Sequence, residues 1–480
     1  MRACRELGIR TVAVFSEVDR NSLHVISADE AYALGGALPR ESYLNQSRIV
    51  EIARSAAVDA IHPGYGFLAE NPDFAQVVGQ ADIGFIGPSP DSIRQMGDKT
   101  QARKAAKRLG IPTVSGTLEP LKDAAQGLHE VGALGFPLLL KAAAGGGGKG
   151  MRVVRSASEF ESAFRTAQSE AKSAFGDDRV YVEKYLDGPR HIEMQILADT
   201  LGNVVYLGER ECSIQRRHQK VVEESPSVAV NAELRMELGN AAVKLAKEAG
   251  YSNAGTMEFL LDSDGKFYFL EMNTRLQVEH PVTEELTGID LVVNQILVTE
   301  GEKLPIRQEE ITHDGHAIEC RICAEDPENA FMPSTGVLTH YDIPQGRIRI
   351  ENGFRPGDEI SVYYDSLLAK VISWGKTRQD AIAVMLRGLD EFKIHGVKST
   401  IPFCRYVLEH KQFTEGQFNT SFIDKYFKPS ELSQISEDEM IAAALTAAII
   451  SGRNGHNKQQ RSLGIESSKW REAKTETYRP

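Results

Sequence analysis

Residues 254–273, AGTMEFLLDSDGKFYFLEMN, contain two apolar segments that flank an Asp-Gly pair at positions 264 and 265. An Asp-Gly pair between apolar segments favours the two-residue turn of an antiparallel hairpin. A turn centred on this pair places Glu258 opposite Glu271. Facing residues of such a hairpin have Cβ atoms about 4.5–5.5 Å apart. The stretch therefore predicts two paired strands that bring two carboxylates close together.

A divalent cation between these carboxylates is the functional interpretation of the hairpin. Two carboxylates at this separation repel each other unless one is protonated or a cation lies between them. Asn273 follows Glu271 by two residues and shares its strand face. Carboxylate and amide oxygens suit Mg²⁺ (or Mn²⁺) that holds phosphate groups. The alternative is a solvated strand pair with splayed charges, because a slip of one residue would turn these side chains to the other face. The same register places Leu260 opposite Phe269.

The composition of the chain is that of a soluble globular protein of several domains. It has 480 residues, 41% of them hydrophobic and 25% charged, and a net charge of −12. This acidic balance disfavours a nucleic-acid surface, and no apolar run reaches the about 18 residues of a membrane span. The five cysteines are scattered, which is typical of a protein from the reducing cytoplasm, and no secretory signal opens the chain. Cys320 and Cys323 form an isolated CxxC pair, which we interpret as strand residues rather than a zinc site.

Helices and strands alternate at the start of the chain, which predicts an α/β fold with a parallel N-terminal sheet. The chain opens with a helix near residues 2–8, whereas a doubly wound sheet normally opens with a strand, so we expect its first strand to be missing. The whole chain is α+β, and we expect five parts: an N-terminal α/β domain at 1–86, a linker and basic helix at 87–113, a mobile lid domain at 114–185, a strand-rich domain at 186–429, and an Ala-rich helix with a polar tail at 430–480.

A glycine-rich loop, KAAAGGGGKGM at residues 141–151, is the second chemical signal. Successive glycines let the backbone approach an anion closely, and their amides can bind phosphate oxygens. The loop differs from a P-loop, because Lys149 precedes Gly150 and a strand follows instead of Ser or Thr and a helix. We expect a hairpin flap that closes over phosphates, and the alternative is a surface hairpin without a ligand.

Two further segments concentrate polar residues. RECSIQRRHQKVVEESP at 210–226 contains Arg216, Arg217, His218 and Lys220, which fit either a cationic pocket for phosphate and a small anion or a charged edge strand. NTRLQVEHPVTE at 273–284 follows the proposed metal ligands directly.

The second of these segments contains Arg275, Gln277, Glu279 and His280. An acid so close to a metal and an arginine is a candidate base with a shifted pKa. The alternative for Arg275 and Glu279 is a buried structural ion pair.

Together these segments resemble the biotin carboxylases of the ATP-grasp superfamily. The resemblance rests on HPGYGFLAEN, MGDK, KAAAGGGGKGM, VEKYLDGPRHIEMQ, ERECSIQRRHQKVVEESP, EMNTRLQVEHPVTE and ECRICAEDP, and it extends from Met1 to about residue 429. It implies an ATP-grasp fold and a reaction in which ATP and bicarbonate form carboxyphosphate. Carboxyphosphate then releases CO₂ beside biotin, and deprotonated N1′ of biotin captures it.

The resemblance also implies a set of ATP and metal contacts. Phosphate contacts are Lys99, Lys141 and His191, with the flap amides of Gly146, Gly147 and Gly148; ribose or phosphate contacts are Gln215 and His218; adenine contacts are Glu183, Lys184, Leu186 and Leu260. The implied Mg²⁺ ligands are Glu258 and Glu271, with Asn273 nearby. This agrees with the register of the predicted hairpin, which places the two carboxylates opposite each other.

A second implied set surrounds bicarbonate and biotin. The bicarbonate contacts are Lys220, Arg275, Gln277 and the backbone of Val278. Glu279 is implied as the base that deprotonates bicarbonate, Arg321 as the cation that stabilises the biotin enolate, and Tyr65 as a further biotin contact.

The chain departs from the family pattern at two places. Ala144 stands where many members have a fifth flap glycine, and the strand with an NRGEIA-like turn that normally precedes the RACRELG helix is absent. Two alternatives therefore stay open: another ATP-grasp ligase, carbamoyl-phosphate synthetase-like or of the purine pathway, and an inactive truncated ATP-binding homologue.

The chain has no Ala/Val-Met-Lys-Met motif for attaching biotin. We therefore expect biotin on a separate biotin carboxyl carrier protein, together with a separate carboxyltransferase subunit. We also expect a homodimer, with neither nucleic acid nor membrane as a partner. The acceptor could be acetyl-CoA, as in fatty acid biosynthesis, propionyl-CoA or pyruvate. The Ala-rich helix after residue 430 is similar to tails of stand-alone pyruvate carboxylase subunits.

Overall fold

The computed structural model describes residues 1–117, 119–132, 134–143, 150–432, 441 and 444–448. The chain divides into two compact units, Met1–Pro429 and Ser430–Pro480. Residues 441 and 444–448 of the second unit are helical and lie in the Ala-rich segment, whereas the polar tail from residue 449 lies outside the described residues. Over the described ranges, no helix has the length and apolar character needed to cross a membrane.

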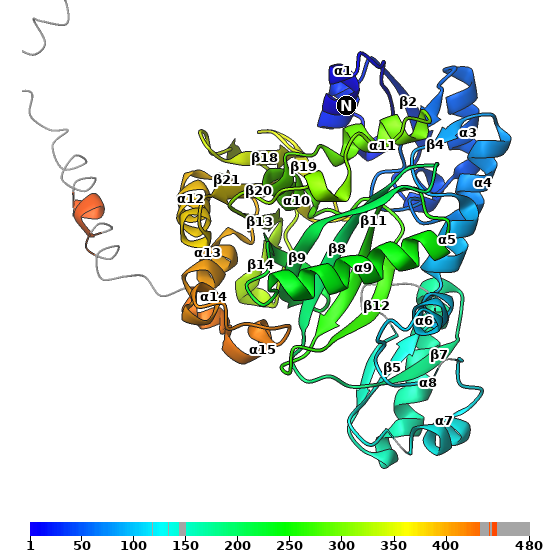
Figure 1. Cartoon of the computed structure of the whole chain (residues 1–480). Coiled ribbons are helices and arrows are strands. Elements are labelled where there is room, and N and C mark those ends of the chain that lie inside the picture. The colour runs from blue at the N-terminus through cyan, green and yellow to red at the C-terminus, as the bar shows by residue number, and fades with distance from the viewer. Residues whose placement is uncertain (118, 133, 144–149, 433–440, 442–443, 449–480) are drawn as a thin grey trace, which may run out of the picture. The chain divides into compact units, whose positions relative to one another are not determined.

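An eight-stranded antiparallel sheet forms the centre of the first unit (Figure 1). Its strand order is β12-β11-β8-β9-β10-β13-β20-β18. The strands are β8 (Arg190–Ala198), β9 (Val204–Arg216), β10 (Gln219–Ser225), β11 (Asn253–Leu261), β12 (Phe267–Asn273), β13 (His316–Cys323), β18 (Arg349–Asn352) and β20 (Leu367–Gly375). Cys320 and Cys323 lie on β13, which confirms that they are strand residues.

The turn of the β11–β12 hairpin is longer than the sequence predicts. The predicted Leu260–Phe269 pair is wrong, because Leu260 pairs with Tyr268. The Asp262 carboxylate accepts a hydrogen bond from the backbone N–H of Lys266 at 2.9 Å, and the Asp262 N–H donates to the Lys266 carbonyl at 2.9 Å. These bonds close a turn with three residues between Asp262 and Lys266 instead of two.

A bulge on β12 restores the predicted register beyond the turn. Phe259 pairs with Phe269, but the next residue of β11, Glu258, pairs with Glu271, so Leu270 is an extra residue on β12. A bulge of this kind places two residues of one strand opposite one of its partner. The prediction that Glu258 faces Glu271 is therefore confirmed, although two deviations of one residue cancel to produce it.

The N-terminal elements alternate as predicted, and their strand pairs are parallel. They form two separate two-stranded sheets, β1-β2 and β3-β4, and no strand among the described residues joins them into the single sheet that was expected. The elements are α1 (Arg2–Glu6), β1 (Val12–Ser16), α2 (Leu23–Ser27), β2 (Glu30–Gly35), α3 (Gln46–Ser55), β3 (Ala60–Ile61), α4 (Pro72–Gln80), β4 (Gly84–Phe85) and α5 (Pro90–Gly97).

The predicted basic helix is α6 (Lys99–Arg108). The Asp98 carboxylate caps it by accepting from the N–H groups of Thr100 and Gln101, so Lys99 is the first helical residue. A three-stranded antiparallel sheet follows, in the order β6-β5-β7. Its elements are α7 (Ala124–Val131), β5 (Leu138–Ala142), β6 (Arg152–Val154), α8 (Ala157–Phe175) and β7 (Val180–Lys184). The glycine-rich loop between β5 and β6 at 144–149 lies outside the described residues.

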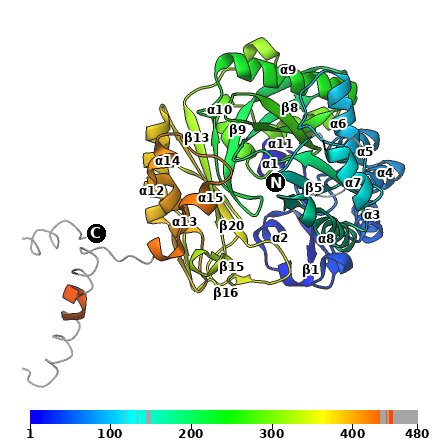
Figure 2. The ribbon, with the colours of Figure 1, turned by 90° about the horizontal axis from the view of Figure 1, so that it is seen from below.

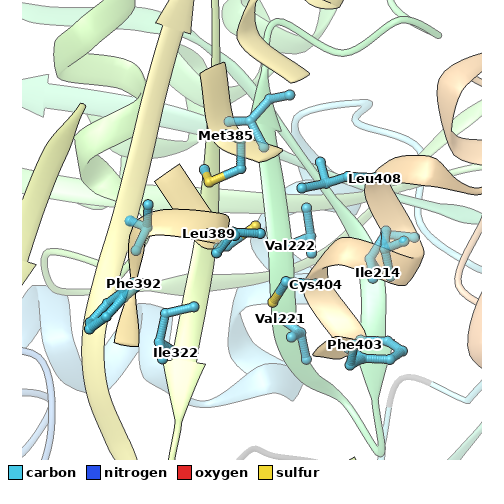
Figure 3. Packing of buried hydrophobic residues seen from close by; sticks show 14 of the residues in the cluster. Ile214, Val221, Val222, Ile322, Met385, Leu389, Phe392, Phe403, Cys404 and Leu408 are labelled. Carbon is cyan, nitrogen blue, oxygen red and sulfur yellow. The ribbon is translucent and has the colours of Figure 1, made fainter. Parts of the chain in front are cut away.

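Helices cover one face of the central sheet. α9 (Ala232–Glu248) crosses β8 and β9, and α12 (Arg378–Glu391) packs on β13 and β20 (Figure 1). Ile192, Met194 and Phe259 face α9 in one apolar core. A second core joins β10 and β13 to α12 and α13 (Ile401–Glu409), where Val222, Ile322, Met385 and Phe403 pack together (Figure 3). Because strand side chains alternate, residues 191, 193 and 258 point to the opposite face.

The remaining elements complete the first unit. In the view of Figure 2, α12 to α15 lie on the left and α3 to α8 on the right of the central strands. These further elements are α10 (His280–Thr287), α11 (Leu291–Thr299), β14 (Glu325–Asp326), β15 (Met332–Pro333), β16 (Gly336–Val337), β17 (His340–Asp342), β19 (Glu359–Ile360), β21 (Lys393–His395), α14 (Lys411–Thr414) and α15 (Phe422–Tyr426).

Candidate active site

The face of the sheet opposite α9 carries a buried layer of charged side chains. Glu258 on β11 pairs with Glu193 on β8, which in turn pairs with Arg210 on β9. Arg210 is fully buried, and its guanidinium donates to Gln195 at 2.7 Å and to Gln277 at 2.7 Å. Buried charges require such partners, so this layer is an ordered polar network and not a solvated strand surface.

Lys220 is the centre of this network. Its ammonium group lies 2.7 Å from Glu279 Oε1 and 3.2 Å from Glu258 Oε1, and it also contacts Glu193. Burial alone would lower the pKa of Lys220, but the three carboxylates raise it well above its usual value. Lys220 therefore keeps its positive charge while nearly buried, and it can attract a small anion.

Glu279 is held between two cations. Besides Lys220, Arg321 donates from Nη2 to Glu279 Oε2 at 2.8 Å, and its Nε donates to Glu223 at 2.6 Å. Burial raises the pKa of Glu279, but Lys220, Arg321 and Arg210 together hold it well below its usual range. The carboxylate is consequently ionised at neutral pH.

Arg275 has a different partner from the one considered in the sequence. The Arg275–Glu279 ion pair is wrong, because Arg275 Nε donates to Glu70 at 2.8 Å. Glu279 precedes α10 and is bound instead by cations of β10 and β13. Arg275 Nη2 also donates to Asn273 Oδ1 at 3.2 Å.

Gln277 and Val278 lie beside this cluster. Gln277 accepts from Arg210 and donates from Nε2 to Glu258 at 3.1 Å. The Val278 carbonyl accepts from the buried Lys370 ammonium at 2.6 Å. The backbone between Asn273 and Glu279 is therefore fixed at several points, which suits a binding site for a small rigid substrate.

The predicted metal ligands form a compact set of oxygen donors. Glu258 and Glu271 face each other, and Asn273 donates from Nδ2 to Glu258 at 2.7 Å. Glu271 is paired with Lys99 at 2.6 Å. The ammonium groups of Lys220 and Lys99 compensate the two carboxylates, and the donor set is the hard-oxygen set that Mg²⁺ prefers, so the residues fit this ion.

His191 belongs to a second group of close potential ligands, with Glu193 and Glu258. Its Nε2 lies 3.0 Å from Glu193 and 3.2 Å from Glu258, close enough for ion pairs although not aligned for a hydrogen bond. Burial lowers the pKa of His191, but Glu258 and Glu193 outweigh this and raise it to about 10. The protonated imidazole that this shift favours forms an ion-pair cluster with the two carboxylates.

Several predicted nucleotide residues meet at β5 and β7. Lys141 Nζ lies 3.0 Å from Glu183 Oε2, and Arg103 Nε lies 3.0 Å from Glu183 Oε1. Both cations also lie over the ring of Tyr181. The Glu183 carboxylate is thus directed into this buried cluster, which leaves its backbone as the group able to contact a base.

The end of β7, which carries the predicted adenine contact Lys184, already forms hydrogen bonds within the protein. The Lys184 N–H donates to the Ser115 carbonyl at 2.7 Å, and its ammonium donates to Gly135 and Phe136 carbonyls. Leu186, two residues beyond β7, is half-buried.

The segment at 210–226 forms a hairpin that separates its cations. Arg216 donates to the Ala330 carbonyl at 2.7 Å and lies over the Phe331 ring, away from Lys220 and its carboxylates. Arg216 therefore has partners of its own, and the cationic pocket stays a prediction for the other basic residues of the segment. His218 lies at the turn with a φ of +66°, and burial and Lys141 lower its pKa. Gln215 donates to the Cys212 carbonyl at 2.7 Å.

The last predicted contacts lie at the edges of the site. Leu260 on β11 is half-buried and pairs with His191 on the neighbouring strand β8. Tyr65 is 42% exposed and lines a cavity of about 360 Å³ together with Lys370. Gly146, Gly147 and Gly148 lie outside the described residues.

Sequence reasoning missed six charged residues of the site: Glu70, Glu193, Arg210, Glu223, Glu319 and Lys370. A signal for Glu193 was present, because HIEMQ at 191–195 alternates polar and apolar residues as a strand with one polar buried face does. Glu319 carries the same signal in IECRI at 318–322, whereas the remaining four show no comparable alternation.

The assembled site can bind a metal–phosphate group beside a cationic pocket for a small anion. Glu279 supplies an ionised carboxylate at the pocket, and Arg321 supplies a fixed positive charge next to it. This combination can transfer a proton from a bound anion and stabilise negative charge that develops nearby.

Comparisons with known proteins agree with this chemistry. Residues 1–93 match the biotin carboxylase N-terminal domain, residues 98–307 the ATP-binding domain of the carbamoyl-phosphate synthase L chain, and residues 319–425 the biotin carboxylase C-terminal domain. Biotin carboxylase 1 of Bacillus subtilis is 50% identical over 89% of this chain and 95% of that protein. A pyruvate carboxylase subunit of Methanothermobacter thermautotrophicus is 49% identical over 94% of this chain and 92% of that protein.

A solved structure is similar over nearly the whole chain. The biotin carboxylase domain dimer of Hydrogenobacter thermophilus 2-oxoglutarate carboxylase, in complex with MgADP, ADP and bicarbonate, has a TM-score of 0.88 and 47% identity, and the match covers 91% of this chain and 96% of that chain. The middle match alone would fit a carbamoyl-phosphate synthetase-like ligase, but the two flanking matches are biotin carboxylase domains, and the Bacillus protein and the Hydrogenobacter domain are named biotin carboxylases. The chain therefore belongs to the biotin carboxylase family and is an ATP-dependent carboxylating ligase.

Proposed function

We propose that this chain carboxylates biotin carried on a separate carrier protein, as the first half-reaction of a multi-subunit carboxylase. The observation that carries the proposal is the position of Glu279, which lies between Lys220 and Arg321. Lys220 also binds Glu258, one of the two facing carboxylates. A base, an anion pocket and a metal–phosphate site then lie within one buried network.

The nucleotide is assigned to the region between β5, β7 and the β11–β12 hairpin. Lys99, Lys141 and His191 are proposed phosphate contacts, with the flap glycines 146–148; Gln215 and His218 contact the ribose or phosphates; Glu183, Lys184, Leu186 and Leu260 contact adenine. Glu258, Glu271 and Asn273 would hold Mg²⁺, which when bound neutralises phosphate charge and polarises the transferred phosphoryl group.

Bicarbonate is assigned to Lys220, Arg275, Gln277 and the backbone of Val278. Glu279 would take the bicarbonate proton, so that a carbonate oxygen attacks the γ-phosphorus and ADP leaves. A bound anion that takes over one contact of Lys220 or Arg321 raises the pKa of Glu279, because it removes part of the positive charge that stabilises the carboxylate. Substrate binding thereby strengthens the base where it is needed.

Biotin is assigned to the side of Arg321 and Tyr65. Arg321 is fixed by Glu223 and Glu279 and presents its charge where the ureido oxygen of biotin becomes an enolate. Fixed positive charge directed at a developing anion costs no reorganisation during the reaction.

The partners follow from the same proposal. We infer a carboxyltransferase subunit, a biotin carboxyl carrier protein and a homodimer, the last supported by the dimeric Hydrogenobacter relative. All five cysteines are free thiols, which supports a cytoplasmic location. The relatives named above include a pyruvate carboxylase subunit and a 2-oxoglutarate carboxylase domain, so pyruvate and 2-oxoglutarate both fit as acceptors, beside the acetyl-CoA and propionyl-CoA expected from the sequence. Domain boundaries at 86, 113, 185 and 429 stay predictions.

One assay tests the proposal. ADP release by the purified chain is measured with Mg²⁺ and ATP, with and without bicarbonate and free biotin. Release that requires bicarbonate and is stimulated by biotin supports the proposal. Release that needs another nitrogen or carboxyl acceptor instead of biotin indicates another ATP-grasp ligase, and nucleotide binding without any turnover indicates an inactive homologue. Lys220→Met should lose the bicarbonate-dependent release, whereas its control Lys244→Met, an exposed change on α9, should keep it.

A further inference from the structure

Two buried glutamates face each other beside the catalytic arginine. Glu223 on β10 pairs directly with Glu319 on β13, and both side chains are fully buried. Directly facing residues of an antiparallel pair have Cβ atoms about 4.5–5.5 Å apart, so their carboxyl groups are within reach of one another. Neither residue has a role in the chemistry assigned above, except that Glu223 binds Arg321.

These two carboxyl groups contain oxygens that receive no hydrogen bond. Glu223 Oε1 accepts from Arg321 Nε at 2.6 Å, but Glu223 Oε2 and both oxygens of Glu319 are buried without a donor. An ionised carboxylate accepts at both oxygens and is costly to bury without donors. Two such groups on facing residues would also repel each other.

The nearby cations are committed to other acceptors. Arg321 is bound to Glu223 and Glu279, and the Lys370 ammonium donates to the Val278 carbonyl. The charges of both cations act to lower the pKa of Glu319. Among the contacts of the described residues, however, neither cation donates a hydrogen bond to Glu319. A proton carried by the pair itself would join one oxygen of Glu319 to Glu223 Oε2 and so give two of these three oxygens a hydrogen bond.

We propose that Glu223 and Glu319 share one proton as a hydrogen-bonded acid pair and that this pair positions Arg321. The proton of one carboxyl group is donated to the free oxygen of the other, and the pair keeps a single negative charge, which binds Arg321 Nε. Arg321 can then direct Nη2 toward Glu279 and, under the proposed function, toward the biotin enolate. The shared proton itself does not depend on that function.

The electrostatic surroundings support this assignment. Burial raises the pKa of Glu319 to about 8 and that of Glu223 to about 7. Such interacting groups titrate as a pair, so one proton remains bound at neutral pH and leaves as the pH rises past about 8. The charged and titratable groups near the pair are Lys220, Cys212, Glu279, Cys320, Arg321, Lys370 and, more remotely, Tyr65.

Loss of the proton should change the charge that acts on Arg321 and on biotin. The pair then carries two negative charges, which hold Arg321 more tightly and oppose negative charge that develops on biotin. We expect biotin carboxylation to fall on the alkaline side of this transition, whereas nucleotide binding, which uses other residues, should not follow it.

Glu319→Gln tests this pH dependence. The amide of the new side chain can donate to Glu223 Oε2 as the protonated acid does, but it cannot ionise. We expect the alkaline fall in biotin-dependent turnover to move to higher pH in this variant and nucleotide affinity to keep its pH profile. The control is Glu237→Gln, an exposed change on α9, which should keep the original profile. An unchanged alkaline fall in Glu319→Gln would overturn the positioning role.

Infrared difference spectroscopy tests the proton without using activity. In the wild-type chain, the carbonyl stretch of a protonated buried carboxyl group should disappear as the pH is raised through about 8. This pH-dependent band should be absent in Glu319→Gln and present in Glu237→Gln. If Glu319→Gln does not fold, Glu223→Gln should remove the same band. A wild-type spectrum without such a titrating band would show that the pair shares no proton, even if the chain is an active carboxylase.

Discussion

Replacing Glu279 by Gln separates proton transfer from nucleotide binding. The change keeps the size of the side chain and an oxygen that can accept from Arg321 Nη2, now 2.8 Å from Glu279 Oε2. It removes the negative charge and presents an amide N–H group toward the Lys220 ammonium, which is 2.7 Å from Glu279 Oε1. The proposed general base is therefore lost while most of the packing remains.

The structure gives the size of both effects. General-base catalysis typically contributes about 100- to 10,000-fold, so we expect kcat to fall by this amount, which corresponds to about 3–5 kcal/mol. Lys220 loses one of three carboxylate partners but keeps Glu193 and Glu258. A hydrogen bond to a charged group is worth about 1.5–3 kcal/mol, so the free energy of unfolding should fall by no more than that amount.

The assay measures bicarbonate-dependent ADP release, nucleotide affinity and urea-induced unfolding in the same preparation. Nucleotide affinity should stay within about twofold, a change below 0.5 kcal/mol, because Glu279 is not among the proposed nucleotide contacts. Glu237→Gln serves as the matched surface control. A parallel fall of nucleotide affinity and turnover would refute the role of Glu279 as a base and assign it to the metal or to the fold.

Three other changes examine the remaining parts of the site. Glu271→Gln removes a charged metal ligand, so the Mg²⁺ concentration for half-maximal ADP release should rise by about tenfold or more; an unchanged Mg²⁺ titration would contradict the hairpin metal site. Arg321→Ala should lower biotin-dependent turnover by about 100- to 1,000-fold with nucleotide affinity retained, measured beside the exposed control Arg387→Ala, and equal turnover in both variants would exclude the enolate role. Arg103→Met leaves the buried Glu183 with Lys141 alone and should cost about 3–5 kcal/mol in urea unfolding; a loss below 1 kcal/mol would mean that the cluster does not stabilise this region.

The hairpin shows which parts of the fold the sequence could predict. Periodicity and the Asp-Gly pair were sufficient to place β11 and β12 and to bring Glu258 opposite Glu271. The turn length was wrong, because the Asp262 side chain closes a larger loop, and the bulge at Leu270 could not be recognised from residue types alone. The correct carboxylate pair thus rested partly on the cancellation of two local deviations.

The partners of the site residues were less predictable than the residues themselves. Motifs identified Glu279, Arg275 and Lys220, yet Arg275 binds Glu70, about two hundred residues away, and Lys220 also binds Glu193. Ion pairs of this kind are set by sheet order and not by local pattern, since neighbours in the sheet come from distant segments. The parallel N-terminal strands were predicted, but their division into two pairs depends on hydrogen bonding that composition does not reveal.

The bulge at Leu270 separates the exposed tip of the β11–β12 hairpin from the part of the strands that carries Glu258 and Glu271. Residues 263–266 are exposed, whereas Glu258 and Glu271 lie beyond the bulge and pair in a regular ladder with β8 behind them. An inserted peptide or a fluorescent label at the tip would therefore displace the loop without shifting the two carboxylates. The hairpin offers an attachment point on the same element as the proposed metal ligands, from which binding of metal and nucleotide could be followed in working enzyme.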